Sequence, residues 1–431
     1  MPARVGAPPD SPAVSDGAGD GGAKNPGAAP TDPAGRPPGT DGPAQPGPGP
    51  AAGSPDPASD EPQLRVTTLE LFFDLVFAFT LTQLTALLAT RFSAAGAAQV
   101  LLIFGLLWWM YEGYAWLTNA RPPVHTAERL LLLVGMAGFL IIGLAIPHGF
   151  GGSAVALGLG YLAVVVVHGF LYFRVNSNIV RVVPFNLASA VLVIVAGLLR
   201  SPAGLERPAG YALWVAALAV QLGSPLIVHP KGLFELRPGH LSERHSALLL
   251  VALGESVAAI GAGAIRTGQE DVRLATAAVL GLALAAALWW VIFGGSDQEA
   301  TERVLTAANS ERRTGLALSA LFYGNIPLLL GLVAMAAGVQ QAIAQSPRPA
   351  AGPIGAAVAL AVGAALFLGG NVAIRRLLGL GPVQLRATAA AVALATTAVG
   401  ALIAVEAQLA TITMLLLILL ILERPAVGQS A

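Results

Sequence analysis

Long apolar segments recur from Leu64 almost to the end of the chain, and they constrain the fold more than any other feature. Each segment has about 17 to 25 residues, enough for a helix to cross a hydrocarbon core of roughly 30 Å. The sequence therefore predicts an all-α, polytopic transmembrane helical bundle of about twelve spans. We place the spans at residues 69–90, 97–118, 130–147, 153–173, 185–200, 209–228, 246–265, 273–294, 314–341, 354–374, 386–404 and 407–422.

The last two segments leave the count open. Glu406 is the only charged residue between Ala387 and Leu422, so these segments also fit one long tilted helix. That alternative gives eleven spans, although such a helix would be longer than a bilayer is thick.

Composition excludes several classes of protein. Only 11% of the residues are charged and 55% are hydrophobic, whereas ordinary soluble chains carry roughly 25% charged residues. Basic and acidic residues balance at 24 each without a basic stripe, which argues against a nucleic-acid partner. The absence of cysteine removes disulfides, thiolate metal sites and a thiol nucleophile. The expected surroundings are a lipid bilayer.

Residues 1–63 differ from the rest of the chain. They consist mainly of Pro, Gly, Ala, Ser and Asp with almost no large apolar residue, so they cannot bury enough surface to offset chain entropy. We expect a disordered tail. It lacks the charged and apolar regions of a secretory signal peptide, so the first span must direct membrane insertion.

The distribution of basic residues predicts the orientation. If the tail is cytoplasmic, fifteen Lys and Arg after the tail fall in inside segments and six in outside loops. Cytoplasmic loops carry the excess of Lys and Arg in membrane proteins. Both termini are therefore expected to be cytoplasmic.

The chain also shows signs of a duplication, with one unit at 64–228 and a second at 241–424. Matching features recur at offsets of 173, 181 and 195 residues. Six spans per unit give both units the same orientation, as in transporters built from parallel repeats. The matched features are Glu70 with Glu243, Thr82-Gln83 with Glu255-Ser256, Trp108-Trp109 with Trp289-Trp290, and Asn176 and Arg181 with Asn371 and Arg376.

Two stretches resemble the signature helices of the bacterial low temperature requirement A family. They are Glu70-Leu-Phe-Phe-Asp74-Leu-Val-Phe with Thr82-Gln83-Leu84, and Glu243-Arg244-His245 with Ala252-Leu-Gly-Glu255-Ser256. The likeness covers about Leu64 to Pro425. It implies a multi-pass protein of the bacterial cytoplasmic (inner) membrane from a family named for a requirement during growth in the cold; it implies no particular reaction.

Three acids near one membrane face are candidate site residues. Glu70 and Asp74 lie one helical turn apart, and Glu112 on the next span reaches about the same depth. Glu70 fits a helix cap or a side chain that reaches the interface. Asp74 and Glu112 fit either a shared cation or proton site or neutralisation by Arg174, Arg181 or Arg376, because a charge at bilayer depth needs a partner.

Glu255 is the candidate nearest the bilayer centre. It fits a protonated, hydrogen-bonded carboxyl group, a proton-exchanging carboxylate or a cation ligand. Gly254, Ala258 and Ala262 form a stripe of small residues beside it, which we expect to pack against another helix.

The remaining polar residues of interest have structural alternatives. Asn325 and Pro327 interrupt the ninth span and free backbone carbonyls, as at ion sites or at simple kinks. His245 at a span entrance is either part of a proton path or solvated. Trp108 and Trp109, with Tyr111 and Tyr114, are expected in an interfacial belt.

Enzyme chemistry finds little support in the sequence. His240 and His245 flank a glutamate, a weak pattern for a metal site, and we predict no metal or cofactor. Ser256 lacks a neighbouring base that would activate a nucleophile.

The sequence thus favours a transporter or channel for an ion, proton or small solute, as a monomer or a homo-oligomer. Its path is expected along the first and seventh spans, with Glu255 and Asp74 carrying charge, Thr82, Gln83 and Ser256 supplying oxygens, and Glu112 and Asn325 beside it. Glu70, Glu243, Arg244 and His245 are assigned structural or possible roles. The alternative is a non-transporting component for cold or stress adaptation, in which the acids are structural.

Overall fold

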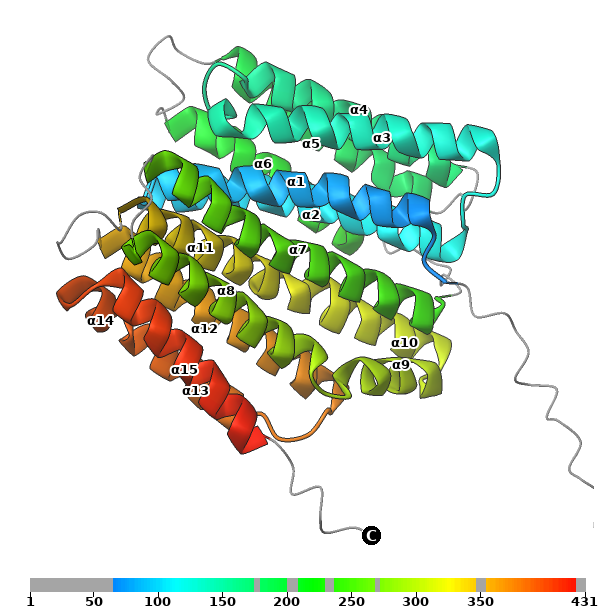
Figure 1. The fold of residues 1–431 in the computed structure, drawn as a ribbon. Coiled ribbons are helices and arrows are strands. Elements are labelled where there is room, and N and C mark those ends of the chain that lie inside the picture. Colours follow the sequence, from blue (N-terminus) through cyan, green and yellow to red (C-terminus); the bar gives the residue numbers. More distant parts are fainter. Residues whose placement is uncertain are drawn as a thin grey trace, which may run out of the picture. The chain divides into compact units, whose positions relative to one another are not determined.

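The computed structural model describes residues 65–173, 179–199, 208–228, 236–267, 272–345 and 354–423, all within the unit Pro62–Ala431. The predicted disordered tail lies outside them. Within these ranges every regular element is a helix, and they contain no strand (Figure 1). The elements are α1 (Thr68–Thr90), α2 (Ala94–Ala120), α3 (Thr126–Ala145), η2 (Ile146–His148), α4 (Ala154–Phe173), η3 (Ile179–Val182), α5 (Val183–Leu198), α6 (Pro208–Val228), α7 (Pro238–Thr267), α8 (Val272–Phe293), α9 (Asp297–Ala307), α10 (Ser310–Leu316), η4 (Ala317–Tyr323), α11 (Gly324–Gln345), α12 (Ile354–Leu378), α13 (Gln384–Ala395), α14 (Thr397–Leu402) and α15 (Val405–Glu423).

Helices coincide with all twelve predicted segments, but not all of them qualify as spans. Ten helical stretches in the described ranges are long and apolar enough to cross a membrane. The other two segments correspond to α5 and α6. With 16 residues, α5 is about 24 Å long, shorter than a typical hydrocarbon core. The predicted count of twelve spans therefore stays a prediction.

The last two segments are separate helices, so the alternative of one long tilted helix is wrong. The break falls at Ile403 and Ala404, after which α15 turns back and packs on α13 and α14. The φ and ψ of Ile403, −116° and −76°, depart from helical geometry.

Helices α1 and α7 lie side by side and join the first six helices to those that follow (Figure 1). On one side, α1 packs on α2 and α3, α3 on α4, α4 on α5, and α5 on α6, which returns to α2. On the other, α7 packs on α8 and α11, α11 on α12, α12 on α13, and α13 on α15, which returns to α8.

Glycines bring two of these helix pairs into backbone contact. A Cβ on Gly138 of α3 would lie 3.0 Å from the carbonyl oxygen of Gly160 on α4. Likewise, a Cβ on Gly331 of α11 would lie 2.6 Å from the carbonyl oxygen of Gly363 on α12. Small residues of this kind allow membrane helices to pack closely.

The ninth predicted span is interrupted before Pro327, at the π-helix η4. Proline has no N–H to donate to an earlier carbonyl, and the indole N–H of Trp108 donates to the carbonyl of Phe322 at 3.1 Å. This hydrogen bond satisfies a backbone carbonyl in η4 and joins it to α2.

The aromatic residues of α2 do not form the expected interfacial belt. Trp108, Tyr111 and Tyr114 are fully buried and pack around Phe73 and Phe77 of α1. They therefore build the core around the polar residues of α1. The matched pair Trp289 and Trp290 on α8 is exposed.

Candidate functional site

The first turn of α1 is closed by a capping box between Thr67 and Glu70. The Glu70 carboxylate accepts the backbone N–H and the hydroxyl of Thr67, both at 2.9 Å, and the Glu70 N–H donates to the Thr67 hydroxyl. Such a cap satisfies N–H groups that a helix start otherwise leaves without partners. Glu70 is nevertheless 2% exposed, so its side chain is enclosed by protein and does not extend into solvent.

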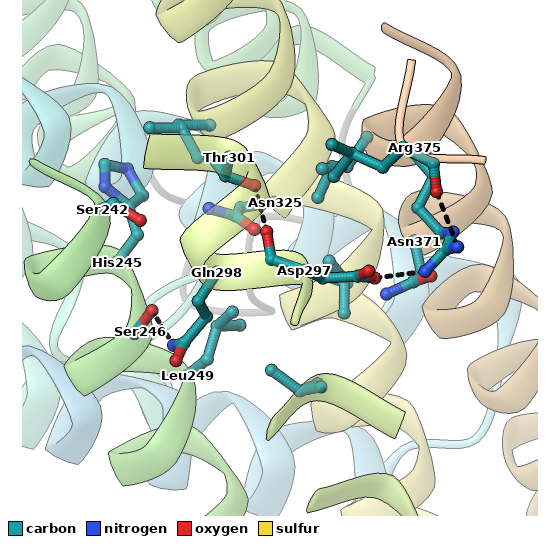
Figure 2. Close-up of a pocket in the computed structure, with 15 residues that line it drawn as sticks. Ser242, His245, Ser246, Leu249, Asp297, Gln298, Thr301, Asn325, Asn371 and Arg375 are labelled. Carbon is teal, nitrogen blue, oxygen red and sulfur yellow. Dashed lines mark hydrogen bonds and ion pairs between the residues drawn. The ribbon is translucent and has the colours of Figure 1, made fainter. Parts of the chain in front are cut away.

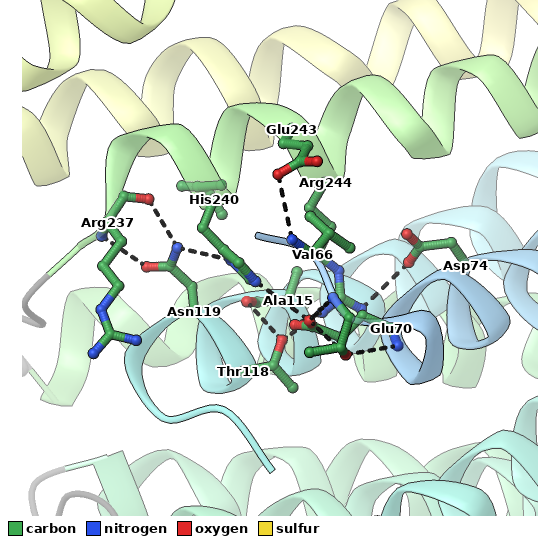
Figure 3. A network of polar contacts seen from close by, with 12 residues as sticks. Val66, Glu70, Asp74, Ala115, Thr118, Asn119, Arg237, His240, Glu243 and Arg244 are labelled. Carbon is green, nitrogen blue, oxygen red and sulfur yellow. Dashed lines mark hydrogen bonds and ion pairs between the residues drawn. The ribbon is translucent and has the colours of Figure 1, made fainter. Parts of the chain in front are cut away.

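Arg244 of α7 holds both acids of α1 (Figure 3). Its guanidinium donates to Glu70 at 3.0 Å, to Asp74 at 3.3 Å and to the Thr118 hydroxyl of α2. The phenol of Tyr111 also donates to Asp74, at 2.8 Å. Since Arg244 is 1% exposed and Asp74 0%, this is a buried ion-pair network at the junction of three helices.

His240 adds a further contact one turn before Arg244. Its Nε2 lies 3.3 Å from the Glu70 carboxylate and its Nδ1 lies 3.2 Å from the amide nitrogen of Asn119. Asn119 also pairs with the backbone of Arg237, accepting its N–H and donating to its carbonyl. The end of α2 is thereby fixed to the start of α7 (Figure 3).

Glu112 contacts His245 of α7, whereas Asp74 contacts Arg244. Its carboxylate lies 2.9 Å from Nε2 of His245 and accepts the indole N–H of Trp116 at 3.1 Å. His245 is 3% exposed, so the expectation of a solvated histidine is wrong. Asp74 and Glu112 thus bond to consecutive residues of α7.

A pocket of about 80 Å³ lies on the other side of His245. Polar side chains of α7, α9, α11 and α12 line it, including Gln298, Asn325 and Arg375 (Figure 2). Asn325 is buried, and Arg375 forms an ion pair with Asp297. The other polar residues that line the pocket are Ser242, Ser246, Thr301 and Asn371.

Glu255 lies apart from this network, about 15 Å beyond His245 along α7. The Thr82 hydroxyl of α1 donates to its carboxylate and also to the carbonyl of Ala78 at 3.3 Å. The Ser256 hydroxyl is buried without a hydrogen-bond partner among the described residues. Gln83 is half-buried and makes no hydrogen bond to any residue that the structure describes.

The small-residue stripe beside Glu255 does not pack as expected. Gly254 and Ala258 are exposed and Ala262 is half-buried. Nothing lies within 4 Å of a Cβ built on Gly254. The stripe is therefore open on the described part of the chain.

The structure brings the predicted site residues together in two groups rather than one. Glu70, Asp74, Glu112, Arg244 and His245 share the end at which α1 and α7 begin, and Asn325 lies across the pocket from His245. Thr82 and Glu255 form the second group. Glu243 is exposed and, among the described residues, accepts only the backbone N–H of Val66, at 3.3 Å.

Sequence reasoning missed the partner of the acids. Three other arginines were considered as partners in one of the two alternatives for Asp74 and Glu112. Of these, Arg181 and Arg376 are exposed, and Arg174 lies outside the described residues. The missed signal was the position of Arg244 in the polar start of the seventh span, where a buried cation needs acidic partners.

Comparison with known proteins matches nearly all of the described chain. The model of the bacterial low temperature requirement A protein family matches residues 65–422. A protein of Rhizobium meliloti (strain 1021), described as uncharacterized, is 26% identical over 325 residues, which cover 73% of this chain and 78% of that protein. The family match runs from just before α1 to the last turn of α15 and includes both groups of polar residues.

Proposed function

The chain belongs to the bacterial low temperature requirement A family of multi-span membrane proteins, and we propose that it is a transporter or channel for an ion, proton or small solute. The observation that carries the proposal is the contact between α1 and α7. Buried ionisable residues make contacts across it at two depths: Arg244 pairs with Glu70 and Asp74, and Glu255 accepts a hydrogen bond from Thr82. Ionisable residues inside membrane proteins are costly and commonly line substrate or ion pathways.

We propose that the path begins at the pocket of Figure 2, passes His245 and continues between α1 and α7. Asp74 and Thr82 are about 12 Å apart along α1. The buried side chains of Phe77, Ala78 and Leu81 occupy the intervening turns. Conduction therefore requires α1 and α7 to move apart, and the present state is closed.

Two parallel repeats, α1–α6 and α7–α15, give this movement a structural basis. The order in which neighbouring helices pack is the same in both sets when α3 is matched with α11 and α4 with α12. The glycine contacts of Gly138 with Gly160 and of Gly331 with Gly363 then occupy matching helix pairs. Both observations support the duplication. In transporters built from repeats, one unit rocks against the other around the site.

We further propose that the protein lies in the inner membrane with both termini in the cytoplasm, because basic residues are concentrated in the corresponding loops. A reporter fused after Gly428, or a protease site inserted near Gly42, is expected to report a cytoplasmic location. Activity of a periplasmic reporter at the C-terminus would contradict an even number of spans.

Transport is tested by reconstituting the purified full-length protein into proteoliposomes and following proton and monovalent-cation flux with entrapped dyes. We expect Glu255→Gln to fold at wild-type levels and to lose most of the flux, because it keeps the side-chain shape and removes the ionisable group. Glu255→Ala should lose flux and also abundance, since it leaves a void. Glu243→Gln is the matched control, because Glu243 is an exposed glutamate of the same helix.

A second candidate function is a non-transporting membrane component for cold or stress adaptation. The pairing of Glu70, Asp74 and Glu112 with residues of α7 favours it, because buried ion pairs also specify helix packing. In that case Glu255→Gln behaves like the wild type and the reconstituted protein conducts neither protons nor cations.

A further inference from the structure

Hydrogen-bond partners fix the protonation of His240. Asn119 has its carbonyl oxygen on the Arg237 N–H and its amide nitrogen on the Arg237 carbonyl, so the orientation of its amide is determined. The second amide hydrogen then points to Nδ1 of His240, which must accept. The remaining nitrogen, Nε2, carries the proton and donates to Glu70. His240 is therefore neutral.

His245 has the opposite arrangement. Its Nδ1 lies 2.8 Å from the carbonyl oxygen of Leu241 and its Nε2 lies 2.9 Å from the Glu112 carboxylate. The Leu241 carbonyl and an ionised Glu112 are both acceptors, so with Glu112 as a carboxylate both ring nitrogens carry hydrogen and the ring is an imidazolium. Glu112, which also accepts the Trp116 N–H, is its counter-ion.

Glu70 is fully satisfied as an anion. Its two oxygens accept from Thr67, His240 and Arg244, and several such donors favour the charged form. Asp74 differs, because one carboxyl oxygen accepts from Tyr111 and Arg244 while the other is buried without a hydrogen-bond partner among the described residues.

The charges of the network then do not balance if Asp74 is ionised. Three carboxylates, Glu70, Asp74 and Glu112, would face two cations, Arg244 and His245. One uncompensated negative charge would remain on the Asp74 carboxylate, one of whose oxygens has no hydrogen-bond partner among the described residues. Burial of an unpaired charge is far more costly than burial of a neutral polar group.

The other helices packed on α1 supply no further cation at this point. Helix α11 contains no charged residue. The charges of α3 lie in its first turn, where Glu128 pairs with Arg121 and Arg129 donates to the carbonyl of Pro123. The element η2 also packs on α1, and its His148 is exposed. Among the described residues, the groups that face Asp74 are thus those already named on α1, α2 and α7.

We infer that Asp74 is a carboxylic acid in this closed state, with an exchangeable proton on its second oxygen, and that the proton is the ion handled at this site. A metal cation fits less well, because the described contacts of Asp74 are with an O–H and N–H groups, which are donors, whereas hard cations require several oxygen ligands. Glu70 and Glu112 stay ionised as counter-ions.

This inference deepens the proposed function and rests on it for the role of the proton in transport. When α1 and α7 separate, the proton leaves the Asp74 oxygen for water, and Asp74 becomes a carboxylate. Asp74 takes up a proton from water again before the helices close, because Arg244 stays held by Glu70 and Thr118.

Infrared spectroscopy of the full-length protein with ¹³C-labelled aspartate tests this assignment. Of the two aspartates in the described residues, Asp74 is buried, whereas Asp297 is partly exposed and paired with Arg375. We expect a carbonyl band of a protonated carboxyl group at neutral pH that shifts on ¹³C labelling and shifts again in D2O. Asp74→Asn should remove the band, and Glu255→Gln should leave it.

The labelled wild-type protein decides the question even if Asp74→Asn fails to fold. No label-sensitive band at neutral pH means that Asp74 is ionised and overturns the inference. A band that does not shift in D2O means a proton that does not exchange, and also overturns it. Flux without the band leaves the transport proposal standing, whereas an exchanging band in a protein without flux removes transport and retains the proton site.

Discussion

Replacement of Arg244 by methionine is expected to cost the protein most of its folded population. Methionine has an apolar side chain of similar length to that of arginine, and it removes the cation shared by Glu70 and Asp74. Breaking a buried ion pair by removing one partner typically costs about 3–5 kcal/mol. The measurement is the yield of monodisperse protein in detergent and its melting temperature, beside Arg376→Met, which alters an exposed arginine.

A second substitution separates charge from packing. Adding Glu70→Gln to Arg244→Met removes the anion that loses its partner, so the double variant should recover a large part of the lost stability. If Asp74 carries a proton, this pair is sufficient and Asp74→Asn gives no further gain. A double variant as unstable as Arg244→Met alone would indicate that the loss comes from packing of the guanidinium between Phe73 and Tyr111.

Glycine substitutions in the α11–α12 pair are expected to have effects of opposite sign. A Cβ on Gly331 would lie 2.6 Å from the carbonyl oxygen of Gly363 and 2.7 Å from the backbone nitrogen of Phe367. Because backbone atoms cannot move aside as a side chain does, the two helices must separate. We expect Gly331→Ala to cost about 1–3 kcal/mol, as in other overpacked cores, and Gly331→Leu to give little folded protein.

Gly369 of α12 provides the matched control, since a Cβ added there would have no other atom within 4 Å. Alanine is a better helix former than glycine by roughly 0.5–1 kcal/mol, so Gly369→Ala should raise the melting temperature. Equal effects at both positions would show that helix propensity, and not the backbone contact, governs this pair of helices.

The positions of the helices could be predicted because hydropathy records where a chain enters and leaves an apolar environment. The largest error is at the start of α7. The apolar pattern placed it at Ser246, whereas the helix begins at Pro238. The missed turns contain His240, Arg244 and His245, whose polar groups are buried because α1 and α2 supply their partners. Hydropathy measures the preference of a side chain for lipid over water and contains no information about such partners.

The candidate site was predictable in its residues but not in its pairings. Glu70, Asp74 and Glu255 were identifiable as charges in apolar segments. The cation that Glu70 and Asp74 contact depends on how α7 packs on α1. That cation is Arg244, which was not among the three arginines considered as partners. The burial of Trp108 was missed for a similar reason, since a tryptophan near a span end fits the interface and its contact with Phe322 is formed only in the folded bundle.

The π-helix η4 has a consequence for the length of the ninth span. Each π-type turn contains one residue more than an α-helical turn that joins the same flanking helices. Deletion of one residue between Ala317 and Tyr323 would convert η4 to an α-helix and leave Asn325 facing the pocket. Deletion of one residue from an α-helical part of the span would instead rotate the two flanking parts relative to each other by about 100°. We therefore expect η4 to tolerate a one-residue deletion better than the rest of this span does.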